Sequence, residues 1–533
     1  MPKLPTSTML PALTATAMRE ADRFTIEALG IPGFTLMESA GRAVLPAILK
    51  QFNITLSELA GWQVLCLCGK GNNGGDGLVV ARVLASAGAQ VNIWLIAPAE
   101  ELSPESKTNL AILEKLVEQD ASLRLSIHVM QASEALPPDG SYNLIVDALL
   151  GTGVSRPLRA SYVAVVNWIN AQSAPVIALD IPTGLHTDSG IVLGAAVRAD
   201  LTVTMGALKT GLLCNEGPAH AGQVEVAEIG IPRIALDRAA DLHACPYVTT
   251  RKAVASWLPK RSRNTHKYAE GMAVVVAGDA GMAGAATLAA TVAARSGAGA
   301  VLCAAPKALQ PVLATKLTEV MTLGLPTTQD GIDGKGALSL LADHEKKATA
   351  LLVGCGMGKK SLTQNFIRNL VHKTTLPTII DADGLNAFVG YTDTFKDLRQ
   401  PVVLTPHWGE FRKLTGVEDA KADRLKLAHQ YATAWNCVLV LKGAPTVVGT
   451  PEGALFISPI VNPALATAGS GDVLAGLCVG LLAQGLTPVQ SALAALYLGG
   501  EAANHYTQHN HPATMLASDL IAHFNIIMNA YKS

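Results

Sequence analysis

The feature that most constrains the fold of this chain is a series of short apolar segments separated by lengths of helical character. In the first half these segments lie at residues 63–69, 90–98, 123–129, 142–151, 174–182 and 199–206. Short apolar runs that alternate with helical spacers indicate strand–helix–strand units, whose strands pair in parallel within one sheet. We therefore predict an α/β fold for this half, with a Rossmann-like, doubly wound sheet.

The same rhythm starts again in the second half of the chain. Its apolar segments lie at residues 272–279, 300–306, 350–356, 378–384, 401–406 and 437–448. Since 533 residues exceed one ordinary core of roughly 150 residues, a second α/β domain with helices on both faces of its sheet is expected. Residues 229–250 hold two prolines and show no sustained periodicity, which places the junction at 240–248. The predicted domains are 1–245 and 246–533.

Charge and cysteine usage narrow the class of protein. The 41 basic and 42 acidic side chains nearly balance, so no global field favours nucleic acid or an anionic membrane. The eight cysteines lie mostly in apolar runs without paired spacing, which predicts reduced, buried thiols. No run reaches 18 uninterrupted apolar residues, and the first 20 residues lack a secretory or transit pattern. We expect a cytoplasmic homo-oligomer that binds small molecules.

The first glycine-rich turn follows the segment 63–68 directly. Residues 69–77 read GKGNNGGDG and precede a helical run. Their G-x-G-x-x-G pattern lets backbone N–H groups and a helix N-terminus approach a pyrophosphate. The acidic residue that normally closes the second strand of an NAD-cofactor site is missing, because residues 90–98 end in Pro98. The turn is therefore expected to hold its ligand in another pose.

Polar side chains stand at two further strand ends of the first half. Asp147 and Asp180 each close an apolar segment just before a loop. Since the carboxyl ends of parallel strands share one edge of a sheet, Asn73, Asp147, Asp180 and Thr183 are expected to converge on one crevice. Carboxylate, amide and hydroxyl oxygens together suit a hard cation. Turn capping explains either aspartate alone, but it does not explain polar groups at three strand ends.

The order of these motifs identifies a resemblance. The segments 18–41, 69–77, 147–157 and 180–185 resemble the epimerase domain of the NAD(P)H-hydrate repair enzymes, over residues 15–235. The resemblance implies potassium ligation by Asn73, Asp147 and Thr183, and contact of Asp180, as a catalytic residue, with the hydrated nicotinamide. Thr183 stands where family members often carry Ser, and the hydroxyl is preserved. The residues implied to hold the hydrate are Asn72, Asn73, Gly74, Gly75, Asp76, Gly151, Thr152, Gly153, Val154, Ser155, Arg156, Pro157 and Asp180.

The second half carries a glycine-rich turn of its own. Residues 469–472 read GSGD and precede an apolar helical pattern, so backbone N–H groups at a helix N-terminus can hold phosphate. Asp472 in that first turn can take a proton from a hydroxyl that attacks the phosphate; the alternative is a simple acidic cap. Residues 442–446, KGAPT, follow a predicted strand and place Lys442 at its end. A cation and small turn residues at this position suit a nucleotide, and a solvated surface lysine is the alternative. His407 also follows a buried strand, with an ordinary turn histidine as the alternative.

These motifs carry a second resemblance. GSGD with the upstream Lys-Gly resembles the ribokinase-like fold, and the segments 266–285, 353–358, 381–386, 405–411 and 468–476 narrow this to the ADP-dependent NAD(P)H-hydrate dehydratases, over residues 250–530. The residues implied to bind nucleotide are Lys442, Gly443, Ala444, Pro445, Thr446 and Gly471. The residues implied to bind the hydrate are Ala285, Gly356, His407 and the catalytic Asp472.

Together the two resemblances imply a bifunctional repair enzyme. One half would epimerise the R and S forms of hydrated NADH and NADPH, and the other would dehydrate the S form with ADP, giving AMP and phosphate. A potassium ion is the implied cofactor, ADP or ATP the co-substrate, and magnesium a candidate companion of the nucleotide. Two alternatives remain at this point. The chain could be a ribokinase-type small-molecule kinase fused to a nucleotide-binding domain, or its first half could be a non-enzymatic module that binds protein or RNA.

Overall fold

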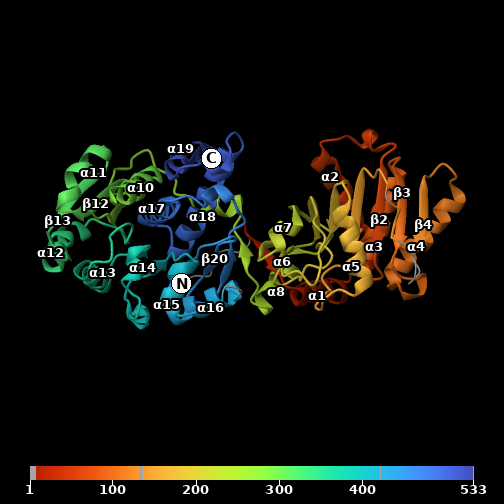
Figure 1. Ribbon diagram of the computed structural model, residues 1–533, viewed down its shortest axis with the longest axis horizontal. Helices are drawn as coiled ribbons and strands as arrows, with labels where there is room; N and C mark the ends of the chain where they lie inside the picture. The colour runs from red at the N-terminus through yellow and green to blue at the C-terminus, as the bar shows by residue number, and fades with distance from the viewer. Residues whose placement is uncertain (1–7, 131–135, 139, 420–421, 532–533) are drawn as a thin grey trace. The chain divides into compact units, whose positions relative to one another are not determined.

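The computed structural model describes residues 8–130, 136–138, 140–419 and 422–531 (Figure 1). The chain divides into two compact units, Leu10–Pro246 and Tyr247–Ser533, and Met9 groups with the second of these. The Thr250 hydroxyl donates a 2.6 Å hydrogen bond to the carbonyl of Thr8, which ties this N-terminal end to the second unit. The division falls within the predicted junction region at 240–248.

The first unit is built on a seven-stranded sheet in the order β4–β3–β2–β5–β6–β7–β9, and every neighbouring pair is parallel. Its strands are β2 (Gln63–Cys68), β3 (Gln90–Leu95), β4 (Leu125–Val129), β5 (Leu144–Ala148), β6 (Val176–Leu179), β7 (Leu201–Met205) and β9 (Gln223–Ala227). The order reverses at β2, so the topological switch point lies between β2 and β5. This confirms the doubly wound fold; β9 was not predicted.

Helices cover both faces of this sheet. On β2, Cys66 and Cys68 pack into the core cluster that holds Ala40 and Leu84, whereas Leu65 packs into a second cluster beneath α5. A strand that is buried on both sides must be apolar at every position, which explains the unbroken run of residues 64–68. The helices of the unit are α1 (Ala15–Arg23), α2 (Gly33–Phe52), α3 (Asn72–Ser86), α4 (Pro104–Gln119), α5 (Ala160–Ala171), α6 (Thr210–Leu213), α7 (Gly217–Ala221) and α8 (Arg233–Leu242). A short pair, β1 (Leu10–Leu13) and β8 (Leu208–Lys209), completes it.

The second unit contains a sheet in the order β13–β12–β11–β16–β17–β18–β19–β20–β21–β10. Its strands are β10 (Tyr247–Val248), β11 (Met272–Val276), β12 (Ala300–Pro306), β13 (Met321–Leu325), β16 (Ala350–Val353), β17 (Thr378–Ile380), β18 (Val402–Leu404), β19 (Val438–Leu441), β20 (Val447–Gly449) and β21 (Leu455–Ile457), with a separate hairpin of β14 (Thr327–Thr328) and β15 (Gly331–Ile332). The run from β13 to β19 is parallel, and β20 is antiparallel to both of its neighbours.

Helices also cover both faces of the second sheet, which confirms the α/β/α layering. Phe366 and Phe411 pack with Val353 in one core cluster. On the other face α10 and α17 lie close together, because a Cβ on Gly476 of α17 would meet the Ala289 carbonyl oxygen at 2.4 Å. The helices are α9 (Arg251–Trp257), α10 (Ala283–Arg295), α11 (Gln310–Lys316), α12 (Gly334–Glu345), α13 (Ser361–Lys373), α14 (Asp383–Asn386), α15 (Trp408–Thr415), α16 (Arg424–Ala434), α17 (Ser470–Ala483), α18 (Pro488–Thr507) and α19 (Ala517–Asn529).

Three local expectations were wrong. The segment 437–448 is two antiparallel strands, β19 and β20, because residues 442–446 form a turn between them. The segment 229–250 is not aperiodic, since it contains α8 and β10. The helix expected to begin after residue 77 begins at Asn72, so the NNGGD sequence forms its first turns.

The structure also bears on the cysteines and on the length of the apolar helices. All eight cysteines are free thiols, and all are buried. Over the described residues, no helix combines the length and the apolar character needed to cross a membrane.

The approach of the β2 and β5 ends predicts a steric limit at Gly69. A Cβ there would lie 1.7 Å from the Leu149 carbonyl oxygen, and only a backbone shift could relieve that overlap. We expect Gly69→Ala to lower the free energy of unfolding by about 1–3 kcal/mol, measured by urea denaturation. Gly153→Ala is the matched control, because no atom lies within 4 Å of its Cβ position. Equal unfolding midpoints for the two variants would contradict the close packing.

Candidate active sites

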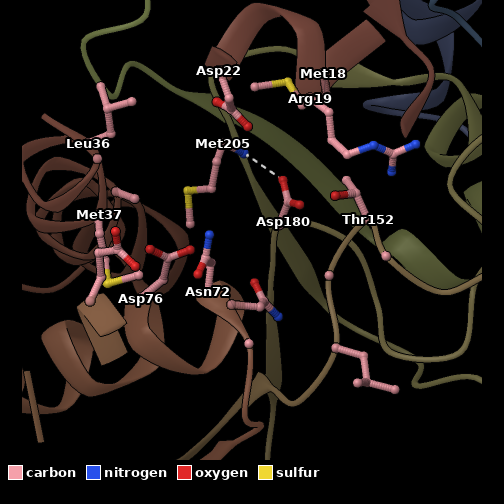
Figure 2. Close-up of a pocket in the computed structure, with 18 of the residues that line it drawn as sticks. Met18, Arg19, Asp22, Leu36, Met37, Asn72, Asp76, Thr152, Asp180 and Met205 are labelled. Atoms are coloured by element: carbon pink, nitrogen blue, oxygen red, sulfur yellow. Dashed lines mark hydrogen bonds between the residues drawn. The ribbon is translucent and has the colours of Figure 1, made fainter. Parts of the chain in front are cut away.

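A cavity of about 490 Å³ opens in the first unit at the carboxyl ends of β2, β5 and β6 (Figure 2). Of the residues predicted to hold a hydrate, those that line it are Asn72, Asn73, Asp76, Gly151, Thr152, Gly153, Val154 and Asp180. A Cβ on Gly151 would lie 3.3 Å from Asn73 Cβ and 3.4 Å from Asp180 Oδ2. The predicted crevice at the switch point therefore exists, and the loop after β5 passes close to both Asn73 and Asp180.

The remaining predicted residues of this set lie elsewhere. A Cβ on Gly74 would meet the Gly69 carbonyl oxygen at 1.8 Å, and one on Gly75 would meet Ser106 Oγ at 2.5 Å. These two glycines therefore let α3 pack closely against its neighbours. The segment 155–157, with Ser155, Arg156 and Pro157, is not part of the cavity lining.

The Asp147 carboxylate is fully buried beside the cavity. It accepts hydrogen bonds from the Thr183 backbone N–H at 2.8 Å, the Thr183 hydroxyl at 2.7 Å and the Leu149 N–H at 3.2 Å. Burial raises its pKa to about 6, against the opposing effect of these donors.

The Asn73 side chain is the third member of the predicted cation site, with Asp147 and Thr183. Its amide oxygen and nitrogen are both buried without a hydrogen-bond partner. Among the described residues, no cluster of three or more His, Cys, Asp or Glu side chains is arranged to hold a metal ion. Amide, carboxylate and hydroxyl oxygens of the kind that Asn73, Asp147 and Thr183 carry suit a hard cation, and such an ion would supply the partner that the Asn73 oxygen lacks.

An ion pair that sequence reasoning missed anchors Asp180. The Lys209 ammonium is fully buried and lies 2.5 Å from Asp180 Oδ1. It also donates to the carbonyls of Met205 at 2.6 Å and Ala207 at 3.1 Å, so its three protons are used. Asp180 has a positive φ of 66°, and its Oδ1 also accepts from the Met205 N–H at 3.2 Å, drawn as the dashed line in Figure 2. The only signal for Lys209 was a lysine within the apolar run 201–213.

Two more carboxyl groups line the same cavity without such an ion pair. Burial raises the pKa of Asp22 to about 6, with Lys209 opposing and Asp180 assisting the shift. Burial and the charges of Asp180 and Asp22 raise the pKa of Asp76 well above its usual range. Asp22 was also missed, although it lies within the motif at 18–41, because only the structure shows that its helix, α1, borders the cavity.

The candidate site of the second unit is built around Lys442, at the end of β19. Its ammonium lies 2.9 Å from Asp381 Oδ1, at the end of β17. Burial opposes the positive charge, but Asp381 and Glu410 outweigh burial and raise the pKa of Lys442. A Cβ on Gly471 would lie 3.4 Å from Lys442 Nζ, so the glycine turn and the lysine meet as predicted. Asp381 was quoted only as part of a motif and had no assigned role.

Asp472 lies in the first turn of α17, directly after Gly469 with its positive φ of 89°. Burial and then the charge of Asp381 raise its pKa to about 6, and the Cys355 thiol donates a hydrogen bond to it. A carboxyl group whose pKa lies near neutral pH, at a helix N-terminus, can exchange a proton with a bound hydroxyl. This is the arrangement expected for a base beside a phosphate.

Two other predicted hydrate contacts, Ala285 and Gly356, meet directly. A Cβ on Gly356 would lie 2.9 Å from Ala285 Cβ, so this turn packs against the first turn of α10. His407 caps α15, where its Nδ1 accepts from the Gly409 N–H at 2.9 Å. The turn-histidine alternative therefore explains Nδ1, while 59% of the side chain stays exposed beside β19.

The KGAPT turn is held by hydrogen bonds of its own. The Gly443 N–H donates to the Thr446 hydroxyl at 3.2 Å, and that hydroxyl donates to the Gly443 carbonyl at 3.0 Å. The Arg424 guanidinium donates to the Lys442 carbonyl at 2.7 Å and leaves no room for a Cβ on Gly443. The peptide bond between Ala444 and Pro445 is cis. Arg424 had no signal in the sequence.

Comparison with known families matches each half of the chain to a different family. Residues 33–211 match the family described as YjeF-related protein N-terminus. Residues 273–525 match the family described as NAD(P)H-hydrate dehydratase.

Whole-length relatives unite the two halves. A bifunctional NAD(P)H-hydrate repair enzyme from Salinibacter ruber is 48% identical over 517 residues, covering 96% of this chain and 95% of that protein. Another from Moorella thermoacetica is 39% identical over 515 residues, with 96% and 95% covered. The crystal structure of ADP/ATP-dependent NAD(P)H-hydrate dehydratase from Bacillus subtilis is 30% identical, with a TM-score of 0.47, and the match covers 53% of this chain and 98% of that one.

The buried ion pair in the first unit leads to a stability prediction. Lys209→Met leaves Asp180 without its ammonium, so we expect the free energy of unfolding to fall by about 3–5 kcal/mol at pH 8. The double variant Lys209→Met with Asp180→Asn removes both charges and should recover part of the loss in urea denaturation. A single variant as stable as the wild type would contradict this.

Proposed function

This chain belongs to the family of bifunctional NAD(P)H-hydrate repair enzymes, and from that premise we propose that its two halves carry out successive reactions on hydrated NADH and NADPH. The first unit interconverts the R and S hydrates, and the second dehydrates the S hydrate with ADP. The observation that carries the proposal is the pair of sites just described. Asp180, ion-paired to Lys209, lines one cavity, and Asp472 stands beside Lys442 at the other site.

In the second unit Asp472 acts as the base. It takes the proton of the C6 hydroxyl of the hydrate, and the hydroxyl oxygen attacks the terminal phosphorus of ADP, with AMP as the leaving group. Lys442 and the backbone N–H groups before α17 stabilise the transferring phosphoryl group. The phosphate on C6 is a better leaving group than hydroxide, so the ring nitrogen expels it, and loss of a C5 proton restores NAD(P)H.

In the first unit Asp180 contacts the hydrated nicotinamide, and the first turns of α3, with Asn72, Asn73 and Asp76, hold the rest of the dinucleotide together with the loop at 151–154. A potassium ion would be held by Asn73, Asp147 and Thr183. It would supply fixed positive charge beside the cavity. The unpartnered Asn73 amide and the fully buried Asp147 carboxylate support this assignment.

The division of labour follows the chain. We propose residues 1–245 as the epimerase domain and 246–533 as the dehydratase domain, since neither set of site residues draws on the other half. A magnesium ion with the nucleotide, a cytoplasmic location and a homo-oligomeric state stay predictions.

The dehydratase assignment predicts a selective loss. Wild-type protein given S hydrate and ADP should regenerate NADH, followed by absorbance, and release phosphate. Asp472→Asn should lower this rate by at least about 100-fold, because it removes the base, while nucleotide binding by calorimetry and epimerisation stay nearly unchanged. Because the base must be ionised, the wild-type rate should be present above pH 6 and fall as the pH drops through about 6.

Asp343→Asn, at an exposed position of the same unit, is the control and should match the wild type. A variant that loses nucleotide affinity without losing turnover would contradict the role of Asp472. A phosphorylated product that accumulates in the wild type would instead indicate a small-molecule kinase.

The cation assignment predicts a potassium requirement for epimerisation. The donor set combines one carboxylate with neutral amide and hydroxyl oxygens, and magnesium demands a near-ideal octahedron of ligands. We expect epimerisation to be at least about tenfold faster in potassium than in lithium buffer, measured by chromatographic separation of the two hydrates. Potassium should also raise the unfolding temperature of the wild type and not that of Asn73→Ala. Equal rates in the two buffers would overturn the assignment.

A further inference from the structure

We propose that Asp22 is a second proton-transferring group of the epimerase, a general acid that works with Asp180 on the C6 hydroxyl of the hydrate. This inference rests on the proposed function of the first unit and deepens it. Nothing in the motifs at the strand ends points to Asp22, which lies on α1 rather than on a loop after a strand.

The first argument is position. Met18, Asp22 and Ile26 follow one another at four-residue intervals and all line the cavity, so one face of this segment forms a wall of it. Asp180 enters the same cavity from the end of β6. Figure 2 shows the labelled carboxyl groups of Asp22, Asp76 and Asp180 around one open space. The charges of Asp180 and Lys209 both act on Asp22, so the two carboxyl groups lie at the same end of the cavity.

The second argument is that the two carboxyl groups differ in their partners. Lys209 forms a direct ion pair with Asp180. Among the described residues Asp22 has no ion pair, and burial raises the pKa of its carboxyl to about 6. When the surroundings of two neighbouring carboxyl groups separate their pKa values, one can act as the acid and the other as the base.

The other carboxyl groups nearby are unsuited to the role. Asp147 is committed to hydrogen bonds from Thr183 and does not line the cavity. Asp76 lines it, but burial raises its pKa well above its usual range, whereas burial raises the pKa of Asp22 to about 6. Efficient proton transfer requires a pKa near the working pH, and Asp22 meets that condition.

The chemistry requires two such groups, because the R and S hydrates differ only at C6. The protonated Asp22 gives its proton to the C6 hydroxyl. The C6–O bond breaks, water leaves, and the ring-nitrogen lone pair forms a C6=N double bond. Water then adds to the other face of C6 while its proton passes to the Asp180 carboxylate, and the C=N electrons return to nitrogen. No electron or atom is gained, and proton exchange with solvent restores the starting state.

The charged side chains that line the cavity together with Asp22 are Arg19, Lys70, Asp76, Glu105, Asp180 and Lys209. Of these, Lys209, Asp180 and Asp76 interact electrostatically with the Asp22 carboxyl. Helix α8 also packs on α1, but its Arg238 lies over the ring of Phe24 instead. The segment β1 carries no charged residue.

The test compares Asp22→Asn with wild type in the full chain at saturating potassium. We expect kcat/KM for epimerisation to fall at least about 100-fold, while NADH-hydrate binding measured by calorimetry changes less than about threefold. Because the acid must be protonated, wild-type kcat/KM should fall as the pH rises above about 6, and this limb should be absent from Asp22→Asn. Glu20→Gln, on the same helix and paired with Arg23, is the control and should behave as the wild type.

A second variant and an isotope make each outcome decisive. Asp22→Glu keeps an acid and should retain the falling limb at a lower rate, even if Asp22→Asn folds poorly. In ¹⁸O-water, each wild-type epimerisation should place one ¹⁸O on C6, and epimerisation without incorporation would overturn the step. If Asp22→Asn epimerises with the kcat/KM of the wild type, or keeps the same falling limb of the pH profile, the role of Asp22 is overturned while the proposed function stands. Absence of epimerisation in the wild type would instead overturn the proposed function.

Discussion

Parallel strand pairing is the constraint on which both sites depend. It brings the carboxyl ends of all strands in a sheet to one edge, so that residues far apart in the chain become neighbours there. In the first unit Asp147 is the next-to-last residue of β5. Asn73 and Asp180, which follow β2 and β6, both lie close to Gly151 in the loop after β5, at the switch point between β2 and β5. In the second unit Asp381 and Lys442 end β17 and β19 and meet in the same manner. The sheets position the chemistry, and loops and helix N-termini complete it.

The two sites share an electrostatic arrangement although they perform different chemistry. Each contains a lysine in an ion pair with an aspartate: the fully buried Lys209 with Asp180, and the half-buried Lys442 with Asp381. Each also contains a further aspartate whose pKa burial raises to about 6, Asp22 in the first unit and Asp472 in the second, while the lysine opposes that shift. A carboxyl group with a pKa near the working pH can both give and take a proton.

The sequence predicted most of this architecture, and its failures have physical causes. Each of the twelve apolar segments located a strand, and all of these strands except β4 lie inside a sheet, where strands covered on both faces are largely apolar. The end of a strand located Asp180, and the glycine turn before a helix located Asp472, because ligands bind at these places in a parallel sheet. Lys209 and Asp22 were missed, since their roles depend on which side chains face one cavity across unlinked elements. The antiparallel direction of β20 was not predicted, because the KGAPT turn marks the end of β19 without indicating in which direction the following residues run.

The protonation states at these sites also have a cost in stability. For Asp22, Asp147 and Asp472 the folded-state pKa is about 6, above the ordinary value of 3.8. Between those values the folded protein binds more protons than the unfolded chain, so lowering the pH from about 6 towards 3.8 favours the fold at these groups. Above pH 6 the ionised carboxylates are held in surroundings that disfavour them. A bound cation beside Asp147 would relieve part of that cost, which links occupancy of the cation site to the stability of the unit that contains it.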